Sequence, residues 1–286
     1  MPERKFRGER RERPEKSFSP RYRDSSDSPR PAPRSEHADD SEYLIEGRNA
    51  LSEAVKSGRS IEKLFVADGA DKGSLTPVIS RCRESGTVIV KCDRRKLDSM
   101  SPTGAHQGVI AFVSPCEYIS VSELIDKALA SGTTPLIVVC DHVEDPHNLG
   151  AIIRSAEVSG AHGVIIPRRR GASVTGTVVK ASAGAALHLP IAKCANLNAA
   201  IRELKERGIW VWGAEGGESR LIYDADFTLP TALVLGSEGD GLSRLTAESC
   251  DGLVSIPMAG NVNSLNVSAA AAVLLFEAVR QRVSQK

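Results

Sequence analysis

Short apolar segments alternate with amphipathic segments along the C-terminal half of the chain. Runs rich in valine, isoleucine and leucine predict strands at 136–140, 163–166, 187–191, 209–212, 232–235 and 253–256. Apolar residues recur at helical spacing between them, over 149–159, 174–181, 197–207 and 242–248. Short strands that are apolar on both faces and alternate with helices are typical of a parallel sheet covered by helices. The predicted fold class over residues 135–286 is therefore α/β, with an open or doubly wound sheet.

Three shorter regions precede this predicted sheet. Residues 1–41 are rich in Arg, Ser and Pro and nearly free of aliphatic residues, so we expect a disordered tail. This tail is either solubilising or a weak, non-specific RNA-binding arm. Residues 115–134 are a linker with a predicted helix at 121–130. Residues 42–114 predict a small α/β domain, with helices at 49–55 and 75–84 and strands at 61–66, 87–90 and 106–113.

Composition limits the classes of partner and of site. The formal net charge is +1, so any RNA site must be a local basic patch rather than a general charge excess. The six cysteines have neither metal-ligand nor redox spacing, so we expect reduced thiols in a cytoplasmic protein. The spacing of Asp141, His142, Asp145 and His147 matches no standard metal site, so no metal is expected. Neither a secretory signal nor a membrane-spanning segment is expected.

The stretch 255–279 ends the sheet and begins the last helix. Pro257 stops the strand, a polar loop follows, and the helix is then apolar at 267 and throughout 269–276. Asn263 and Ser264 are expected to cap this helix, because their side-chain oxygens can accept from free backbone N–H groups. Apolar residues, including Val273 and Phe276, lie on nearly every face. The helix should therefore be buried on several sides, within one domain or against a second subunit.

Polar residues follow the first predicted strand, at the sheet edge where α/β proteins bind ligands. Pro146 and Asn148 mark the turn into a helix, and Asn148 is expected to cap it. Arg154 lies near the same helix start, where a cation is unfavourable for the helix dipole. Such a residue is either functional or an ordinary surface arginine, and this stretch alone favours neither.

Other loops supply further candidates. Arg168, Arg169 and Arg170 follow the second strand at the same edge and predict a phosphate-binding patch that Lys180 extends, with a solvated loop as the alternative. In the small domain, Arg48 with Lys91 and residues 94–96 predicts a basic face or an ordinary solvated surface.

The loop LGSEGDGLS follows the fifth predicted strand, and its glycines allow the backbone to approach a ligand closely around Glu238. It lacks the GxGxxG spacing and does not follow the first strand, so a Rossmann dinucleotide site is disfavoured. The loop GAEGGES after the fourth strand is also small enough to line the same pocket.

Three motifs follow one another along the chain: DPHNLGAIIRSA from Asp145, LGSEGDGLS from Leu235 and IPMAGNVNSLNVSAAAA from Ile256. Together they closely resemble the signature motifs of the SpoU (TrmH-type) RNA ribose 2′-O-methyltransferases of the SPOUT superfamily. IEGRNAL and HQGVIAFV resemble the small ribosomal-protein-like RNA-binding domain of the larger members. The best resemblance is to RlmB-type enzymes, which methylate a guanosine ribose of large-subunit ribosomal RNA.

The resemblance implies S-adenosylmethionine as the methyl donor, a trefoil-knotted C-terminal domain and an obligate homodimer. It implies catalytic roles at the motif positions of Arg154 and Asn148, and it places Asn266 near the cofactor. By hydrogen bonding, Asn148 and Asn266 could position the ribose and Arg154. The resemblance implies that the cofactor is bound by Gly236, Ile256 and Leu265, with Leu235, Glu238, Met258 and Ser264 nearby. Relatives often have small residues where this chain has Asn261 and Asn263, which affects only loop details.

The leading hypothesis is methylation of a ribose 2′-hydroxyl in large-subunit ribosomal RNA. A transfer-RNA substrate, or the ribosomal site of a resistance-type methylase, is an alternative within the same class. A non-catalytic RNA-binding assembly factor and an α/β nucleotide enzyme unrelated to RNA are alternatives from other classes. Arg154 would activate the hydroxyl either as a base or by stabilising the developing oxyanion, and the sequence leaves both open.

Overall fold

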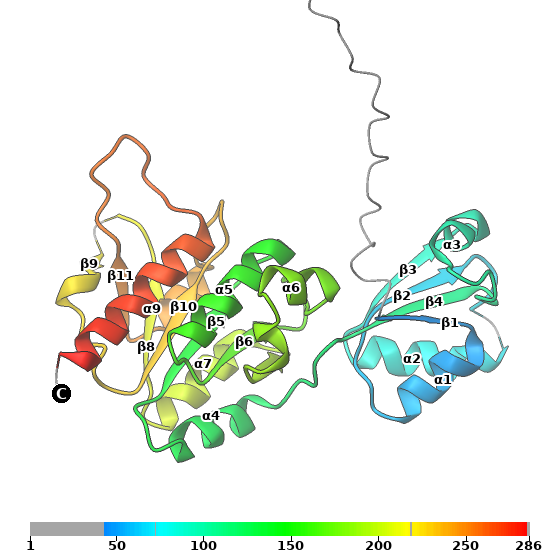
Figure 1. The fold of residues 1–286 in the computed structure, drawn as a ribbon, viewed down its shortest axis with the longest axis horizontal. Helices are drawn as coiled ribbons and strands as arrows, with labels where there is room; N and C mark the ends of the chain where they lie inside the picture. Colours follow the sequence, from blue (N-terminus) through cyan, green and yellow to red (C-terminus); the bar gives the residue numbers. More distant parts are fainter. Residues whose placement is uncertain (1–42, 72, 218, 285–286) are drawn as a thin grey trace, which may run out of the picture. The chain divides into compact units, whose positions relative to one another are not determined.

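Two sheets organise the part of the chain that the structure describes. The structure is a computed structural model, and it describes residues 43–71, 73–217 and 219–284 (Figure 1). The tail predicted over residues 1–41 lies outside the described residues.

The small domain contains a four-stranded sheet of order β1-β4-β2-β3. Strands β2 and β3 are parallel, whereas β4 is antiparallel to both β1 and β2. Apolar clusters form on both faces of this sheet. Its elements are β1 (Leu44–Glu46), α1 (Arg48–Lys56), β2 (Ile61–Ala67), η2 (Gly73–Leu75), α2 (Thr76–Glu84), β3 (Val88–Cys92), α3 (Arg94–Met100) and β4 (Val109–Val113).

The sequence predicted most of these elements but missed β1 and α3. Strand β1 has only three residues, too few to show a periodic pattern. Helix α3 has the sequence RRKLDSM, in which only Leu97 is buried, so it carries no amphipathic repeat. Its start is fixed by Asp93, whose side chain accepts a hydrogen bond from the Lys96 backbone N–H at 2.8 Å.

The large domain contains a seven-stranded sheet of order β7-β6-β5-β10-β8-β11-β9, in which all neighbouring strands are parallel. The predicted α/β class and parallel sheet are therefore confirmed. Its strands are β5 (Leu136–Cys140), β6 (Gly163–Pro167), β7 (Ile191–Cys194), β8 (Trp210–Ala214), β9 (Arg220–Leu221), β10 (Thr231–Leu235) and β11 (Gly252–Ser255). Its helices are α4 (Val121–Ala130), α5 (Pro146–Val158), α6 (Gly176–Ala181), η3 (Ala185–Leu187), α7 (Leu197–Glu206), η4 (Ile222–Asp224), α8 (Arg244–Ser249) and α9 (Val267–Val283).

The strand predicted at 187–191 is wrong. Ala185–Leu187 form a short 3-10 helix, and strand β7 begins only at Ile191. Pro190 has no backbone N–H to give to a ladder, so a strand can begin at this proline but not run through it. Leu187, which the pattern placed in the sheet, is 49% exposed.

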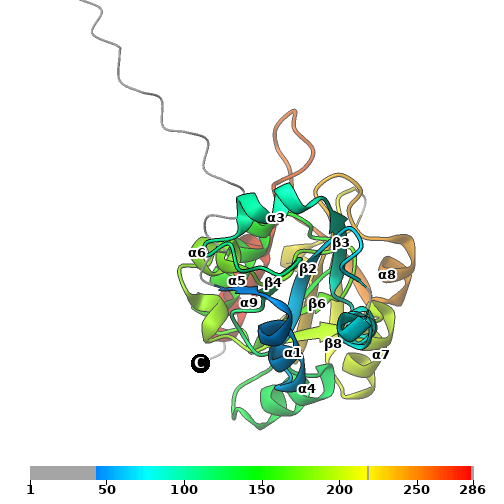
Figure 2. The ribbon, with the colours of Figure 1, turned by 90° about the vertical axis from the view of Figure 1, so that its right-hand side faces the viewer.

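Helices cover both faces of the large sheet, as the apolar strands predicted. Leu136 and Val138 of β5 pack in one core with residues of α5, α6 and α9. The intervening Ile137 and Val139 pack in a second core with residues of α4 and α7. Figure 2 shows α5 and α9 on one side of the large sheet and α7 and α8 on the other. Among the described residues, no helix is long and apolar enough to cross a membrane.

Helix α9 differs from its prediction in two respects. Its N-cap is Asn266, whose side chain accepts from the Ser268 backbone N–H at 2.9 Å, rather than Asn263 or Ser264. Within one chain it is buried along one stripe only, because Val273 and Phe276 are 38% and 50% exposed. Packing within the domain therefore buries only part of the apolar surface of this helix, and within one chain the helix presents an apolar face to solvent.

Candidate functional site

The residues predicted to bind the cofactor meet in one cavity. It has a volume of about 640 Å³ and lies where the loops after β8, β10 and β11 converge. The loop after β8 contributes Glu215, Gly216 and Gly217, as its small residues predicted. The predicted cofactor residues that line the cavity are Leu235, Gly236, Glu238, Ile256, Met258, Ser264 and Leu265.

The backbone after β10 shapes this cavity. Ser237 and Gly241 pair with each other through two backbone hydrogen bonds of 2.9 and 3.2 Å, so residues 237–241 form a tight turn. This turn folds back on Gly236, where an added Cβ would lie 2.2 Å from the Gly241 carbonyl carbon. Residue 236 must therefore be glycine for steric reasons, since no side chain fits between the strand end and the turn.

A polar network joins the three motifs beside the cavity. Glu238 Oε1 accepts hydrogen bonds from Asn148 Nδ2 at 2.5 Å and from Asn266 Nδ2 at 2.6 Å. Asn266 Nδ2 also donates to Asn148 Oδ1 at 3.0 Å. The carboxylate thus fixes both amides and couples the starts of α5 and α9. The prediction that Asn148 caps α5 is wrong, because the cap is Asp145, which accepts from the His147 backbone N–H at 2.8 Å.

A second cavity of about 530 Å³ shares one wall with the first. The shared residues are Ser237, Glu238, Asp240, Gly241 and Val267. The second cavity is lined in addition by Asn148, Ser243 and residues 142–145 of the loop after β5. Glu238 thus lines both the cofactor-sized cavity and the second, more acidic space, whereas Asn148 lines only the second cavity. Asn266 lines neither cavity and is held beside them by its hydrogen bonds to Glu238 and Asn148.

Arg154 is not brought into either cavity. It lies in α5 six residues after Asn148 and is exposed to solvent. Neither cavity wall includes Arg154, whereas Asn148 lines the second one. Six residues along a helix correspond to more than one and a half turns, so the two side chains leave the helix on different faces.

The basic residues predicted to bind RNA in the large domain lie outside both cavities. Arg168, Arg169 and Arg170 are exposed and follow β6, which is parallel to and paired with β5, so they lie at the sheet edge that carries Asn148. Lys180 is exposed near the end of α6. These residues line neither cavity, so they belong to the surface around the site.

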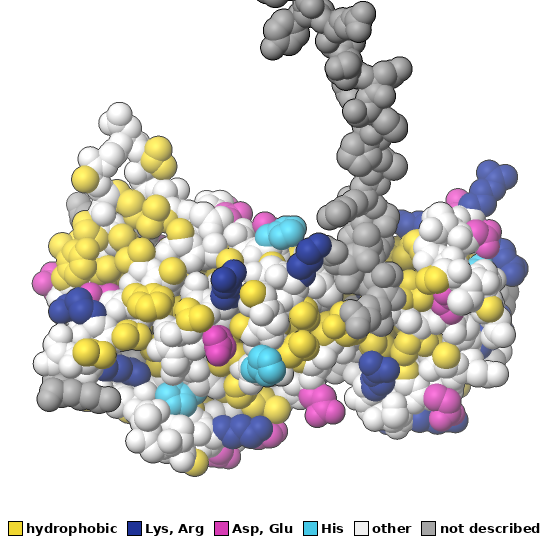
Figure 3. All heavy atoms as spheres, viewed as in Figure 1, with side chains coloured by type: hydrophobic (Ala, Val, Ile, Leu, Met, Phe, Trp, Pro, Cys, Tyr) yellow, Lys and Arg dark blue, Asp and Glu magenta, His cyan; other side chains and the backbone are white. Residues whose placement is uncertain are grey.

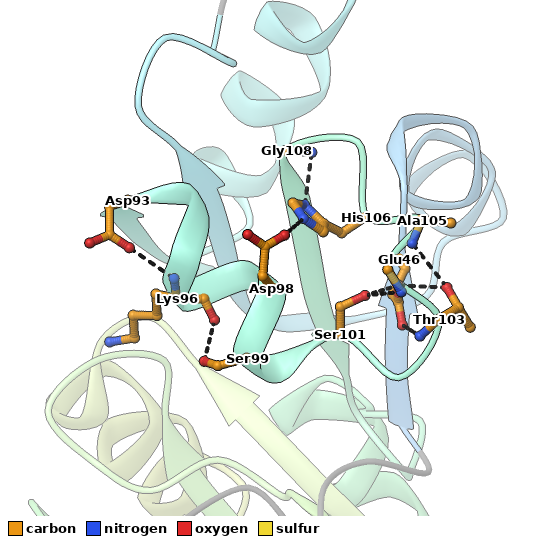
Figure 4. Close-up of polar contacts among 11 residues, drawn as sticks. Glu46, Asp93, Lys96, Asp98, Ser99, Ser101, Thr103, Ala105, His106 and Gly108 are labelled. Atoms are coloured by element: carbon orange, nitrogen blue, oxygen red, sulfur yellow. Dashed lines mark hydrogen bonds and ion pairs between the residues drawn. The ribbon is translucent and has the colours of Figure 1, made fainter.

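Arg48 is fixed by a loop of the small domain. Its Nε donates to the Gln107 carbonyl at 3.2 Å. The loop itself is held by polar contacts to the rest of the domain (Figure 4). Glu46 accepts from the hydroxyls of Ser101 and Thr103 at 2.5 and 2.9 Å, and His106 Nε2 lies 2.9 Å from Asp98 Oδ1. Of the other predicted basic residues, Lys91 is paired with Asp71 at 2.8 Å, so not all of that face is available to RNA.

All six cysteines are free thiols, as predicted. Cys140 ends β5 directly before the second cavity, and burial raises its thiol pKa to about 12. Burial likewise raises the pKa of Cys194 to about 11 and that of Cys250 to about 12. These thiols stay protonated near neutral pH and are poor nucleophiles. Within the ranges that the structure describes, no three His, Cys, Asp or Glu side chains gather to hold a metal ion.

Comparison with known families gives the context of this site. The model of the SpoU rRNA Methylase family matches residues 135–276, and the model for RNA 2′-O ribose methyltransferase substrate binding matches residues 44–119. YacO of Bacillus subtilis, named as a TrmH family tRNA/rRNA methyltransferase, is 45% identical over 241 residues, which are 84% of this chain and 96% of YacO. The chain belongs to the SpoU family of RNA methyltransferases.

Solved structures of SpoU enzymes share the fold. AviRb of Streptomyces viridochromogenes, crystallised with AdoMet, is 29% identical with a TM-score of 0.55, covering 84% of this chain and 90% of AviRb. An AdoMet-bound rRNA methyltransferase of Sinorhizobium meliloti is 26% identical with a TM-score of 0.53, covering 83% and 87%. The resemblance drawn from the motifs is thus confirmed at the level of the SpoU family. The predicted fold, a SPOUT-type parallel-sheet domain preceded by a substrate-binding domain, is confirmed as well.

The relatives carry names that cover both transfer RNA and ribosomal RNA.

The sequence did not predict one contact in the site. Asp141 and His142 were weighed only as metal ligands, yet they form a hydrogen-bonded pair at the second cavity. Because Asp141 and His142 are consecutive in the sequence, a hydrogen bond between their side chains could have been expected.

Proposed function

We propose that this SpoU enzyme transfers a methyl group from S-adenosylmethionine to a ribose 2′-hydroxyl, on a guanosine of large-subunit ribosomal RNA. One observation carries the proposal: the predicted cofactor residues line a single cavity, and this cavity adjoins the network of Asn148, Glu238 and Asn266. The ribose target follows from the substrate-binding match, which is to RNA 2′-O ribose methyltransferases.

The first cavity fits the cofactor. Leu235, Ile256 and Leu265 offer apolar contacts for an adenosyl group, and Glu238 and Ser264 offer polar ones. Its volume of about 640 Å³ lies within the usual range for small-molecule sites. When bound, S-adenosylmethionine supplies an activated methyl group on a sulfonium, so the residues around it need only orient the acceptor and handle its proton.

The asparagines position the acceptor. Glu238, which lines both cavities, holds the amide group of Asn148, which lines the second cavity, and that of Asn266. Amide side chains can both donate to and accept from a ribose hydroxyl. A 2′-hydroxyl held there lies next to the cofactor cavity, and the requirement for this hydroxyl selects RNA over DNA.

Arg154 stabilises the negative charge that develops on the 2′-oxygen. A guanidinium keeps its proton at any physiological pH, which makes it a good partner for an oxyanion and a poor base. Because Arg154 lines neither cavity of its own chain, we propose that a second copy of the chain brings it to the site.

The apolar face of α9 supports this homodimer. Val273 and Phe276 are exposed on the helix, and Met258, Val262 and Leu265 are exposed in the loop before it. Figure 3 shows hydrophobic side chains gathered over the region that Figure 1 colours orange and red. Helix α5, which carries Arg154, packs against α9, so a partner on this face lies close to Arg154.

Complementation between two inactive variants tests this arrangement. Arg154→Ala should bind S-adenosylmethionine normally and lose turnover, whereas Gly236→Ala should lose cofactor binding. Mixed dimers of the two should recover activity, because one of their two sites holds an intact cofactor cavity and an intact arginine. Equal loss of cofactor binding and turnover in Arg154→Ala would show a structural role, and mixed dimers without activity would place arginine and cofactor on the same chain.

The RNA target is tested in cells. A deletion strain should lose one 2′-O-methyl group in large-subunit ribosomal RNA, and the wild-type gene should restore it while the Arg154→Ala gene should not. Loss confined to a transfer RNA would assign the second candidate substrate, which the tRNA/rRNA names of the relatives cover as well. An unchanged methylation map with a ribosome assembly defect would support the non-catalytic role.

A further inference from the structure

The loop after β5 carries a buried acid and a partly exposed imidazole in direct contact. His142 Nδ1 lies 2.5 Å from Asp141 Oδ1, with the two side chains 37% and 3% exposed, respectively. The other oxygen of Asp141 accepts from the Ser243 backbone N–H at 2.9 Å. The carboxylate is therefore fixed from two sides, and it orients the imidazole.

This contact sets the tautomer of the histidine. A carboxylate accepts a hydrogen bond, so the neutral imidazole carries its proton on Nδ1 and keeps a lone pair on Nε2. Among the described residues, His142 Nε2 has no hydrogen-bond partner. An acid that orients an imidazole with a free Nε2 is the arrangement that enzymes use to remove a proton from a hydroxyl.

The position of His142 matches that role. It lines the second cavity together with Asn148 and Glu238, and Glu238 also lines the cofactor cavity. Its φ is +58°, a conformation that non-glycine residues seldom adopt. Strained residues of this kind persist where the surroundings fix them, and they concentrate at functional sites.

We propose that His142 is a catalytic residue and that its Nε2 accepts the proton of the target 2′-hydroxyl. This inference rests on the proposed methyl transfer. The O–H bond breaks as the oxygen forms its bond to the methyl carbon, the carbon–sulfur bond breaks with its electron pair left on sulfur, and the proton passes to Nε2. The imidazolium, paired with Asp141, then releases the proton to water. Arg154 keeps its role as the stabiliser of negative charge.

Four carboxylates also line the second cavity, and each is a possible alternative to His142 as the base. Glu144, Asp145, Glu238 and Asp240 line the second cavity around His142. Asp145 is engaged at the start of α5, and Glu238 is engaged with the two asparagines. Glu144 and Asp240 are the remaining carboxylates and could act as the base instead of His142. The experiment therefore includes the variants Glu144→Gln and Asp240→Gln.

The experiment measures single-turnover methyl transfer by the full-length protein with RNA from the deletion strain. The variant is His142→Gly, because glycine adopts positive φ freely and leaves room for added imidazole. The matched control is His147→Asn, at an exposed histidine in the first turn of α5 that lines neither cavity. We expect His142→Gly to lose about 10²- to 10⁴-fold in rate, the usual contribution of a general base, with affinities for RNA and S-adenosylmethionine unchanged.

Chemical rescue separates proton transfer from a structural role. Added imidazole should restore part of the His142→Gly rate, more basic imidazoles should restore more, and His147→Asn should behave as the wild type. A His142→Gly rate equal to the wild type, absence of rescue, or equal loss in Glu144→Gln or Asp240→Gln would overturn the assignment. A wild-type protein that methylates no RNA would instead refute the proposed function, and this inference with it.

Discussion

Substitution of Gly236 by alanine is a sharp test of how the cofactor cavity is built. The new Cβ would lie 2.2 Å from the Gly241 carbonyl carbon, 2.3 Å from its oxygen and 2.4 Å from the Leu242 nitrogen. Non-bonded carbons are most stable ~3.5 Å apart, so the backbone at Gly241 must retreat by about 1.3 Å. All three contacts are to backbone, so no side chain can rotate away to relieve them. The shift moves the 237–241 turn, which walls both cavities.

The expected consequences follow from this displacement. Overpacking of this kind costs about 1–3 kcal/mol of stability, so the variant should fold with a melting temperature lowered by several degrees. A misplacement of about 1 Å near the chemistry costs on the order of 10² in rate. Isothermal titration with S-adenosylmethionine should show severe loss of affinity, and methyl transfer should fall by at least that factor.

Gly239→Ala is the matched control in the same turn. A Cβ at Gly239 meets no protein atom within 4 Å, and its φ lies outside the positive region, so the melting temperature should stay at the wild-type value although Gly239 lines the same cavity. The reasoning is refuted if Gly236→Ala binds S-adenosylmethionine as the wild type does. It is also refuted if both alanine variants lower the melting temperature equally, since the backbone clash at Gly236 would then not be the cause.

Two further predictions concern α9. Phe276→Asp should give a folded monomer in analytical ultracentrifugation at micromolar concentration, because burying the exposed half of this ring contributes about 1 kcal/mol per chain to a dimer; a dimeric variant would contradict the proposed interface. Glu277 is buried and accepts from Arg280 and Gln281, and the hydrogen bond from Arg280 is the main cause that lowers the Glu277 pKa below 4.5. A depressed carboxyl pKa stabilises the fold above the unfolded-state value, and this contribution disappears as pH falls through the folded-state pKa. The melting temperature of the wild type should therefore exceed that of Glu277→Gln at neutral pH and equal it in acid. A difference in melting temperature that does not change with pH would refute the ion-pair account.

Much of the large domain could be predicted because its strands are buried on both faces. Continuous apolar runs mark β5, β6 and β10, and the loops after β5, β8, β10 and β11 then fall at one sheet edge. The assignment of Leu235, Gly236 and Ile256 to one cofactor site came from the resemblance of the motifs, and the structure brings these residues to one cavity. Pro190 misled the prediction because an apolar run continues across a residue that interrupts the ladder.

What could not be predicted depends on tertiary contacts. Helix α9 is apolar on nearly every face, so its pattern cannot separate the stripe against the core from the stripe that remains exposed at Phe276. The position of Arg154 outside both cavities depends on which face of α5 packs inward. The Asp141–His142 contact occurs with a positive φ at His142, a backbone conformation that the hydrophobic pattern does not indicate.

The central claim is best tested by the transfer of labelled methyl from S-adenosylmethionine to total RNA of a deletion strain. Digestion of the RNA then locates the label. The account predicts label on a guanosine 2′-oxygen of large-subunit ribosomal RNA, present with the wild-type protein and absent with Arg154→Ala. Cofactor binding without label on any RNA, or label on a base instead of a ribose, would contradict it.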